Sequence, residues 1–262
     1  MEMQGRVAIV TGGALGIGKG AAECLSRAGA AVMIVDVQEK AGNHAARDLR
    51  GTNTEVDFTR ADIACAEEVG KAVDETVRRF GTIDVLVNNA GIQTFGGPVD
   101  TTEDVWDRTM NVNLKGHWLM SKAVLPHLLK KGKGAIVNVS SVQGLASQIN
   151  VLAYATSKHA MIGLTRSMAV DLAPAGVRVN CVCPGTVDTP MIRWIIDQDK
   201  DPRRLERTLN KMHPIGRIGT PREIGEVILF LASDRASFMT GSIVTVDGGL
   251  LVPIAGSPEQ SD

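Results

Sequence analysis

Short runs of β-branched and other apolar residues recur along this sequence, and helical segments lie between them. The runs are, in chain order, "RVAIVT", "AAVMIVD", "TEVDFTRAD", "IDVLVNNAG", "GAIVNVSS", "VRVNCVCPG" and "SIVTVDGG". Strands this uniformly apolar are buried on both faces, as in a parallel sheet that helices cover on both sides. The pattern predicts an α/β fold, a doubly wound parallel sheet of seven strands with helices on both faces.

The 262 residues are expected to form a single domain. An α/β fold of this size can be one unit with a large core, and no internal repeat, low-complexity linker or composition shift divides the chain. We expect this domain to span residues 1–252, with residues 253–262 as a flexible tail. Between about residues 186 and 219 the pattern is irregular, which predicts a lid-like insert over a site.

Charge and composition exclude several classes of partner. The chain is 44% hydrophobic and 22% charged, with a formal net charge of -1, which argues against disorder and against a polybasic surface for nucleic acid. No apolar run is long enough to span a bilayer, and the start "MEMQGRVAIV" lacks the pattern of a signal peptide. We expect a cytoplasmic protein whose partner is a small molecule, not nucleic acid or a membrane.

The four cysteines do not form a metal-site pattern. They are Cys24, Cys65, Cys181 and Cys183. Metal sites and redox pairs favour a C-x-x-C spacing, whereas Cys181 and Cys183 are two residues apart, so that both face the same way on a strand. We predict four buried, reduced thiols and no metal site.

A glycine-rich turn, "TGGALGIGKG", follows the first predicted strand and has two interpretations. With Gly13, Gly18 and Lys19 it nearly matches the phosphate-binding loop of nucleoside triphosphatases. That loop requires a Ser or Thr hydroxyl after the lysine to bind Mg²⁺, and this chain has Gly20 there. The triphosphatase interpretation therefore lacks its metal-binding group.

The second interpretation uses the spacing of Gly12, Gly16 and Gly18. Glycines so placed allow a tight turn from the strand, a close approach to a pyrophosphate, and the start of a helix whose N-terminal amides face the phosphates. The next strand ends at Asp36, where a carboxylate can accept hydrogen bonds from the adenosine ribose and repel a 2′-phosphate. Leu15 and Val37 offer no compensating positive charge, so NAD is favoured over NADP.

The alternative role for Asp36 is to cap the helix that begins near Gln38.

The only tyrosine of the chain, Tyr154, precedes Lys158 by four residues in "YATSK". Residues four apart on a helix lie on the same face, close enough to interact. A tyrosine has a pKa of about 10, which is high for a general base at neutral pH. A neighbouring ammonium would favour the phenolate.

Five elements in this order resemble the short-chain dehydrogenase/reductase family over nearly the whole chain. They are the glycine turn, "NNAG", "VSS", "YATSK" and "PG". The resemblance implies a Rossmann-type single domain, a nicotinamide cofactor and a homotetramer, because "MTGSIVTVDGG" is similar to a segment that is commonly buried between subunits.

The resemblance implies four catalytic residues, Asn113, Ser141, Tyr154 and Lys158. Tyr154 would take the proton of a substrate hydroxyl, and Ser141, thirteen residues before it, would polarise the substrate oxygen. Lys158 would favour the phenolate and hold the nicotinamide ribose, and Asn113 would kink its helix and hold a water.

Two neighbours of these residues receive other roles. We expect Asn111 to lie on another face of the helix that carries Asn113, and Ser140 to be a strand-end residue that bonds locally.

The same resemblance implies the cofactor contacts. The residues are Gly12, Leu15, Gly16, Ile17, Gly18, Asp36, Asp62, Ile63, Asn89, Ala90, Gly91, Tyr154, Lys158, Pro184, Gly185, Val187 and Thr189. We expect NAD as the cofactor.

Polar amides gather around the predicted site and indicate a polyhydroxylated substrate, because an apolar ligand would leave them unpaired. The candidate substrate residues are Gln93, Gln143, Gln148 and Arg193. The stretches around them are similar to sugar dehydrogenases of the L-fucose type. We expect an NAD-dependent oxidoreductase of a sugar or sugar acid, with a 3-oxoacyl or other ketoreductase and a non-catalytic NAD-binding sensor as alternatives. His159 is expected to be a packing or surface residue, and Arg203 and Arg204 a solvated charge run rather than an anion site.

Overall fold

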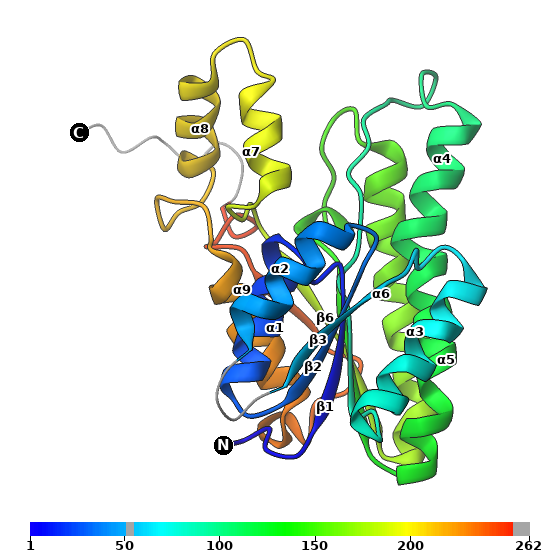
Figure 1. Ribbon diagram of the computed structural model, residues 1–262. Helices are drawn as coiled ribbons and strands as arrows, with labels where there is room; N and C mark the ends of the chain where they lie inside the picture. The colour runs from blue at the N-terminus through cyan, green and yellow to red at the C-terminus, as the bar shows by residue number, and fades with distance from the viewer. Residues whose placement is uncertain (51–54, 254–262) are drawn as a thin grey trace.

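Seven strands form one parallel sheet, as the sequence predicts (Figure 1). Their order in the sheet is β3-β2-β1-β4-β5-β6-β7. The computed structural model describes residues 1–50 and 55–253, so nearly all of the predicted tail lies outside the described residues. The strands are β1 Val7–Thr11, β2 Ala31–Asp36, β3 Val56–Arg60, β4 Val85–Asn88, β5 Gly134–Val139, β6 Val177–Pro184 and β7 Ile243–Val246.

Helices cover both faces of this sheet and make a three-layered domain (Figure 1). One layer holds α1 Gly16–Arg27, α2 Glu39–Leu49 and α9 Pro221–Ala232, and the other holds α3 Ala66–Phe80, α5 Gly116–Lys131 and α6 Leu152–Leu172. The short helix α4 Glu103–Met110 continues into α5 through a π-helical turn, η1 Asn111–Lys115. The predicted doubly wound single domain is confirmed.

The alternation of side chains along a strand builds two hydrophobic cores, one on each face of the sheet. On β2, Val32 and Ile34 pack with α1, α2 and α9. Met33 and Val35 point the other way and pack with α3 and α5. Because successive strand residues face opposite sides, a strand buried on both faces must be apolar throughout. This requirement explains the uniform runs in the sequence.

The strand order reverses between β1 and β4, the first strands of the two halves of the sheet. Ligands of open α/β sheets bind beside the carboxyl ends of the strands at such a reversal. The ends of β1 and β4 carry the glycine turn and the "NNAG" segment. The topology therefore brings together two motifs that are more than seventy residues apart in the chain.

The irregular insert forms two helices, α7 Pro190–Asp197 and α8 Pro202–Lys211, that stand beyond the carboxyl edge of the sheet (Figure 1). Arg193 on α7 donates to Asp188 at 2.6 and 2.8 Å and to Glu206 on α8 at 2.7 Å. These ion pairs join the two helices and the segment that precedes them. Its role as a lid stays a prediction.

Three of the four cysteines are buried, and all four are free thiols. The prediction of four buried thiols is wrong for Cys65, which is partly exposed because it is the N-cap residue of α3. Within the described part of the chain, no helix is both long and apolar enough to cross a membrane. Nor do the described residues include a group of three His, Cys, Asp or Glu side chains that could hold a metal ion.

Helices α1 and α9 approach each other through glycines. A Cβ atom added to Gly225 would lie 2.6 Å from the carbonyl oxygen of Gly20, and one added to Gly20 would lie 2.5 Å from that of Pro221. No real Cβ contact is this short, and backbone atoms cannot move aside as a flexible side chain can. Gly225→Ala should therefore lower the free energy of unfolding by roughly 1–3 kcal/mol, as overpacking does.

The control is Gly163→Ala, in the middle of α6, where an added Cβ would meet nothing within 4 Å. This variant should gain about 0.5–1 kcal/mol, because alanine favours helix more than glycine. Urea unfolding of both variants tests the close contact between α1 and α9. Equal free energies of unfolding for the two variants would contradict this contact.

Candidate active site

The glycine turn after β1 has the geometry of a dinucleotide-binding loop. Gly12 and Gly16 have φ of +61° and +53°, a region that L side chains rarely adopt. A Cβ at Gly18 would lie only 2.1 Å from the carbonyl oxygen of Gly12, so α1 begins directly against the turn. The N-terminus of α1, which starts at Gly16, faces the space beside β1 with its free backbone amides.

The segment after β4 forms a wall beside this turn. The Asn89 side chain donates to the carbonyl oxygens of Thr11 at 3.0 Å and of Gly12 at 3.2 Å. The Thr11 hydroxyl accepts in return from the backbone N–H groups of Asn89 at 2.9 Å and of Ala90 at 3.1 Å. Four hydrogen bonds therefore fix the two motifs against each other.

Asp36 lies at the end of β2, where its buried carboxylate faces the turn. Oδ2 accepts from the Ala14 N–H at 3.2 Å, and Oδ1 accepts from the Gln38 N–H at 3.0 Å. The N-cap of α2 is Gln38 rather than Asp36. The carboxylate thus orders the entry to α2 and still presents its remaining lone pairs to the cavity that it lines.

A cavity of about 760 Å³ extends along the carboxyl edge of the sheet. Thirteen of the predicted cofactor residues line it: Gly12, Leu15, Gly16, Ile17, Asp36, Asp62, Ile63, Asn89, Ala90, Gly91, Tyr154, Lys158 and Thr189. Of the remaining predicted residues, Gly18 packs beneath the turn and Val187 is buried in the core. Pro184 and Gly185, at the end of β6, are likewise not part of the lining.

The predicted kink at Asn113 is a π-helical turn. Asn113 is completely buried, and its side chain bonds both backbone groups of Ile92, accepting from the N–H and donating to the carbonyl, each at 2.8 Å. Its Nδ2 also donates to the Ser157 hydroxyl at 3.1 Å. Asn113 therefore ties the wall after β4 to α6, the helix that carries Tyr154.

The Ser141 hydroxyl lies close enough to the Tyr154 phenol to affect its pKa, and the catalytic roles of both residues stay predictions. The Ser141 hydroxyl also accepts from the backbone N–H of Gln143 at 3.1 Å, which caps the short turn after β5. Burial raises the pKa of Tyr154, and the hydrogen bond with Ser141 acts in the lowering direction. Burial is the larger cause, so the phenol is protonated in this structure.

Lys158 lies over the face of the Tyr154 ring, with Nζ 5.6 Å from the ring centroid. Nζ donates to the carbonyl oxygen of Val139 at 3.0 Å. Burial and Ser141 are the causes of the pKa shift of Tyr154, so the expectation that Lys158 lowers this pKa stays a prediction. Burial lowers the pKa of Lys158 itself to about 8.

Ser140 bonds across the fold rather than locally. Its hydroxyl donates to the carbonyl oxygen of Lys158 at 2.8 Å, eighteen residues away in sequence. The expectation of a local bond is therefore wrong, because α6 packs directly against the end of β5. Ser140 also lines the cavity.

The predicted substrate residues lie outside the lining of this cavity. The Gln143 amide donates to the Gln148 side chain at 2.9 Å. Gln93 is partly exposed in the segment after β4. The Arg193 guanidinium is already paired with two carboxylates. Their contact with substrate stays a prediction.

His159, Arg203 and Arg204 are exposed, consistent with the surface roles predicted for them.

Several lining residues were not predicted. Asn111 does face away from Asn113, but the face that it occupies lines the cavity. Its neighbours Asp107 and Arg108 on α4 and Met191 on α7 also contribute to the wall. The chain order of the family motifs gives no signal for these positions, since they depend on how α4 and α7 are placed over the sheet.

His117 is a further residue that pattern reasoning missed. It is completely buried on α5 and bonds the carbonyl oxygen of Ala90 at 2.6 Å through Nε2. Burial lowers its pKa to about 3, so the ring is neutral and Nε2–H is the donor. Hydrogen bonds thus fix the segment after β4 on two sides, from His117 on α5 and from the glycine turn.

The residues present fit a dinucleotide. The turn leaves no room for Cβ atoms at Gly12 or Gly18, which lets a pyrophosphate approach the backbone. Asp36 and Asp62 line the side of the cavity at the ends of β2 and β3, and Tyr154 and Lys158 line the other side.

Fold and site together define an oxidoreductase that binds a nicotinamide cofactor. Residues 12–251 match the family described as Enoyl-(Acyl carrier protein) reductase, a branch of the short-chain dehydrogenases/reductases. The chain belongs to the short-chain dehydrogenase/reductase family.

Its relatives include a reductase and dehydrogenases that are named for different substrates. The chain is 38% identical to a 3-oxoacyl-(acyl-carrier-protein) reductase of Thermotoga maritima, over 96% of this chain and 100% of the relative. It is 41% identical to 2-(S)-hydroxypropyl-CoM dehydrogenase 3 of Xanthobacter autotrophicus, over 95% and 98%. The solved aldohexose dehydrogenase of Thermoplasma acidophilum superposes with a TM-score of 0.89 at 37% identity, covering 98% of each chain.

The buried Lys158 gives a pH dependence of known sign. In the unfolded chain its pKa is 10.5 and in the fold about 8, so between these values the unfolded state holds a proton that the folded state has lost. The free energy of unfolding should therefore rise as the pH increases from about 8 to about 10.5, by at most roughly 1.4 kcal/mol per pH unit.

The measurement is the difference in free energy of unfolding between the wild type and Lys158→Met from pH 7 to pH 10. Across this range the free energy of unfolding of the wild type should rise relative to that of the variant. The exposed Lys122→Met serves as the control, and a constant difference for Lys158→Met would contradict the assignment.

Proposed function

We propose that this protein is an NAD-dependent dehydrogenase that moves a hydride between nicotinamide and a secondary alcohol or hemiacetal carbon. The observation that carries this proposal is the joint placement of Tyr154 and Lys158 at one side of a cavity whose other side is a dinucleotide-binding turn. Ser141, in the turn after β5, lies next to Tyr154 but outside the lining. The bound nicotinamide supplies the hydride acceptor or donor.

The chain's own residues supply proton transfer and orientation. Ser141 donates a hydrogen bond to the substrate oxygen and, through its bond with Tyr154, places that oxygen at the phenol. Tyr154 takes the hydroxyl proton in oxidation and returns it in reduction. Lys158 keeps a positive charge beside the ring at neutral pH, because its lowered pKa of about 8 still lies above 7. Asn113 holds α6 in place through Ser157.

Asp36 supports the choice of NAD. Its carboxylate is buried at the adenosine end of the cavity with two backbone donors, so that it is fixed in position. An NADP 2′-phosphate would meet this charge with no basic neighbour, since Val37 and Gln38 follow it and line the same cavity. NAD is the cofactor that this charge pattern accommodates.

A sugar or sugar acid is the first substrate class proposed. The Gln143–Gln148 amide pair lies directly after the catalytic serine, and Gln143 Oε1 is a buried acceptor with no partner. A substrate hydroxyl would satisfy it, and sites built around unpaired polar groups discriminate against ligands that cannot. The aldohexose dehydrogenase among the structural neighbours supports the same class.

A 3-oxoacyl or other ketoreductase is the second candidate. One observation favours it: Arg203, Arg204 and Arg207 are exposed on α8, beyond the carboxyl edge of the sheet. A basic surface there is what an anionic acyl-carrier arm would require. A non-catalytic NAD sensor is the third candidate and predicts cofactor binding without turnover.

We also propose a homotetramer in the cytoplasm. Strand β7 is an edge strand with partly exposed residues, and Phe238, just before it, is fully exposed. Pairing with another subunit is one way to cover an unpaired strand edge and an exposed aromatic side chain beside it. Light scattering of the purified protein tests the assembly, and a monomer would refute it.

Tyr154→Phe tests the catalytic assignment. The variant keeps the ring and its packing but loses the transferable proton, so kcat should fall by roughly 10²–10⁴-fold while NAD affinity stays unchanged. Turnover is followed as NADH formation over aldoses, sugar acids, polyols and simple secondary alcohols. A fully active variant would refute the mechanism.

Asp36→Ala combined with Val37→Arg tests the cofactor assignment. Removing the carboxylate and adding a guanidinium should invert the preference, so that kcat/KM with NADP exceeds that with NAD. The matched control is Asp62→Ala, a second carboxylate of the lining with no proposed role in this choice. Unchanged selectivity in the double variant would rule out the role of Asp36.

A further inference from the structure

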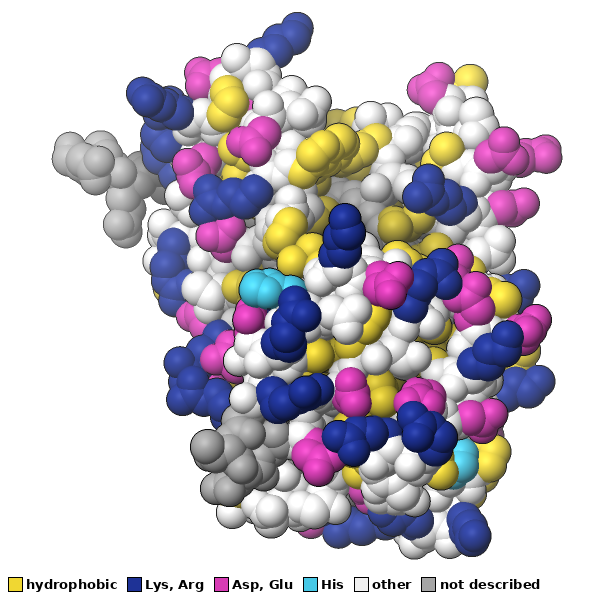
Figure 2. All heavy atoms as spheres, viewed as in Figure 1, with side chains coloured by type: hydrophobic (Ala, Val, Ile, Leu, Met, Phe, Trp, Pro, Cys, Tyr) yellow, Lys and Arg dark blue, Asp and Glu magenta, His cyan; other side chains and the backbone are white. Residues whose placement is uncertain are grey.

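Large hydrophobic side chains are exposed on α7, at the start of α6 and on the segments after β4 and β5, whose other residues include several that line the cavity. They are Phe95, Leu145, Ile149, Leu152, Met191 and Trp194. Trp194 is 58% exposed and Ile149 96% exposed. Figure 2 shows hydrophobic side chains gathered beside the hollow between the two upper parts of the molecule. Exposed apolar surface of this extent next to a cavity is typical of a binding site.

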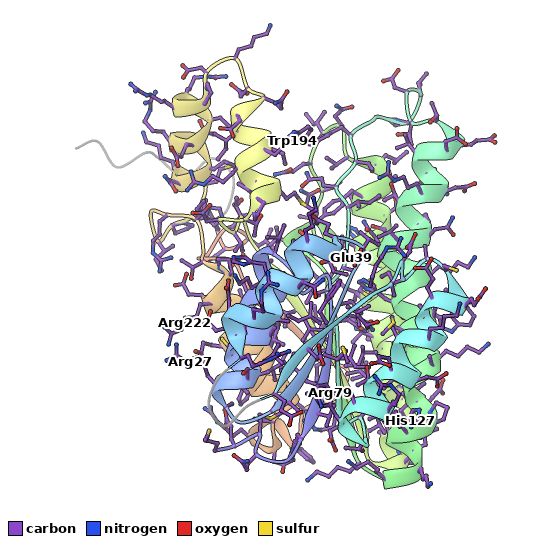
Figure 3. All side chains as sticks on the ribbon, in the orientation of Figure 1. Arg27, Glu39, Arg79, His127, Trp194 and Arg222 are labelled. Atoms are coloured by element: carbon purple, nitrogen blue, oxygen red, sulfur yellow. The ribbon has the colours of Figure 1, made fainter. Side chains whose placement is uncertain are left out.

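One side of this surface belongs to α7. Met191 lines the cavity, and Trp194 follows it by three residues, so both lie on the same face of the helix. In Figure 3 the Trp194 side chain lies on the side of α7 that faces the loops leading to α4 and α6. Trp194 therefore extends the cavity wall outward from the site.

The other side is a pair of loops clasped together. The Gly96 N–H donates to the Asn150 carbonyl at 2.9 Å, and the Leu152 N–H donates to the Gly96 carbonyl at 3.1 Å. Asn150 has φ of +66°, the one positive value among the described residues other than glycine. Such a conformation costs energy and persists where the surrounding structure holds it.

The clasp holds two segments that carry exposed apolar side chains. Phe95 adjoins Gly96, and Leu152 begins α6 two residues before Tyr154. The polar pair Gln143 and Gln148 comes from the same loop. The α7 side is thus apolar, and the β5–α6 side carries one polar atom without a partner, the Gln143 amide oxygen.

A substrate that suits both sides must have an apolar face and a polar edge. An alkyl chain would leave the Gln143 acceptor unpaired, and an open-chain polyol has no continuous apolar face. A hydroxylated six-membered ring has both, with C–H groups on its face and hydroxyls on its rim. Tryptophan is the side chain with the largest rigid flat surface to cover such a face.

We propose that Trp194 is a specificity-determining residue that packs against the face of a cyclic substrate, so that the enzyme selects hydroxylated rings over open chains. This inference rests on the proposed dehydrogenase function and narrows its substrate class. Trp194 acts on binding and takes no part in proton or hydride transfer.

The test compares ring and chain substrates in wild type, Trp194→Ala and Trp194→Phe. The pairs are galactose with galactitol, and cyclohexanol with 2-hexanol, assayed by NADH formation. Trp194→Ala should lower the ring-to-chain ratio of kcat/KM by about ten-fold or more, through KM, and Trp194→Phe should restore most of it. Trp118→Ala, an equally drastic change at an exposed tryptophan of α5, should leave the ratio unchanged.

A second measurement does not depend on turnover. With Trp106→Phe and Trp118→Phe, Trp194 is the only tryptophan of the chain, and its fluorescence should change when galactose or cyclohexanone is added to the NAD complex. An unchanged ratio in Trp194→Ala, or unchanged fluorescence at saturating ring compound, overturns the inference. Absence of turnover with all four alcohols refutes the proposed function instead, and the fluorescence result then still decides the ring site.

Discussion

The close contact between the glycine turn and the wall after β4 is the constraint on which the site depends. Asn89 bonds two carbonyl oxygens of the turn, and a side chain at Gly12 would run into Ala90. Because the two segments come from strands at the reversal of the sheet, their contact fixes the cavity between the two halves of the domain. Asn113 and His117 then hold the far side of the same wall. Nothing in this arrangement depends on the substrate.

The elements that the sequence predicted are those whose structural reason is local. A strand buried on both faces must be apolar at nearly every position, so the five inner strands β2, β1, β4, β5 and β6 left a readable trace in the sequence. Tyr154 and Lys158 are one helical turn apart, and their shared face follows from helix geometry. The glycines of the turn are required by backbone conformation and close packing, which other residues cannot satisfy.

The residues that were missed are those whose partners are distant in sequence. His117 contacts Ala90, and Ser140 contacts Lys158, through packing of helices against strand ends that no periodicity encodes. The direction of the Lys158 side chain toward Val139 is equally a tertiary result. The substrate side is the extreme case, because its proposed walls come from two loops and helix α7, which meet only in the folded chain.

The part of the cavity lining that α4 contributes depends on one extra residue in the π-helical turn between α4 and α5. A π turn places one more residue in a helical turn than an α-helix does. Loss of one residue from Asn111–Lys115 would therefore let a continuous α-helix form and rotate α4 by about 100° about its axis relative to α5. Asp107 and Arg108 would swing away from the cavity, and the bond from Asn113 to Ser157 that holds α6 would be disturbed. The length of this turn thus determines which face of α4 is directed toward the cavity and toward α6.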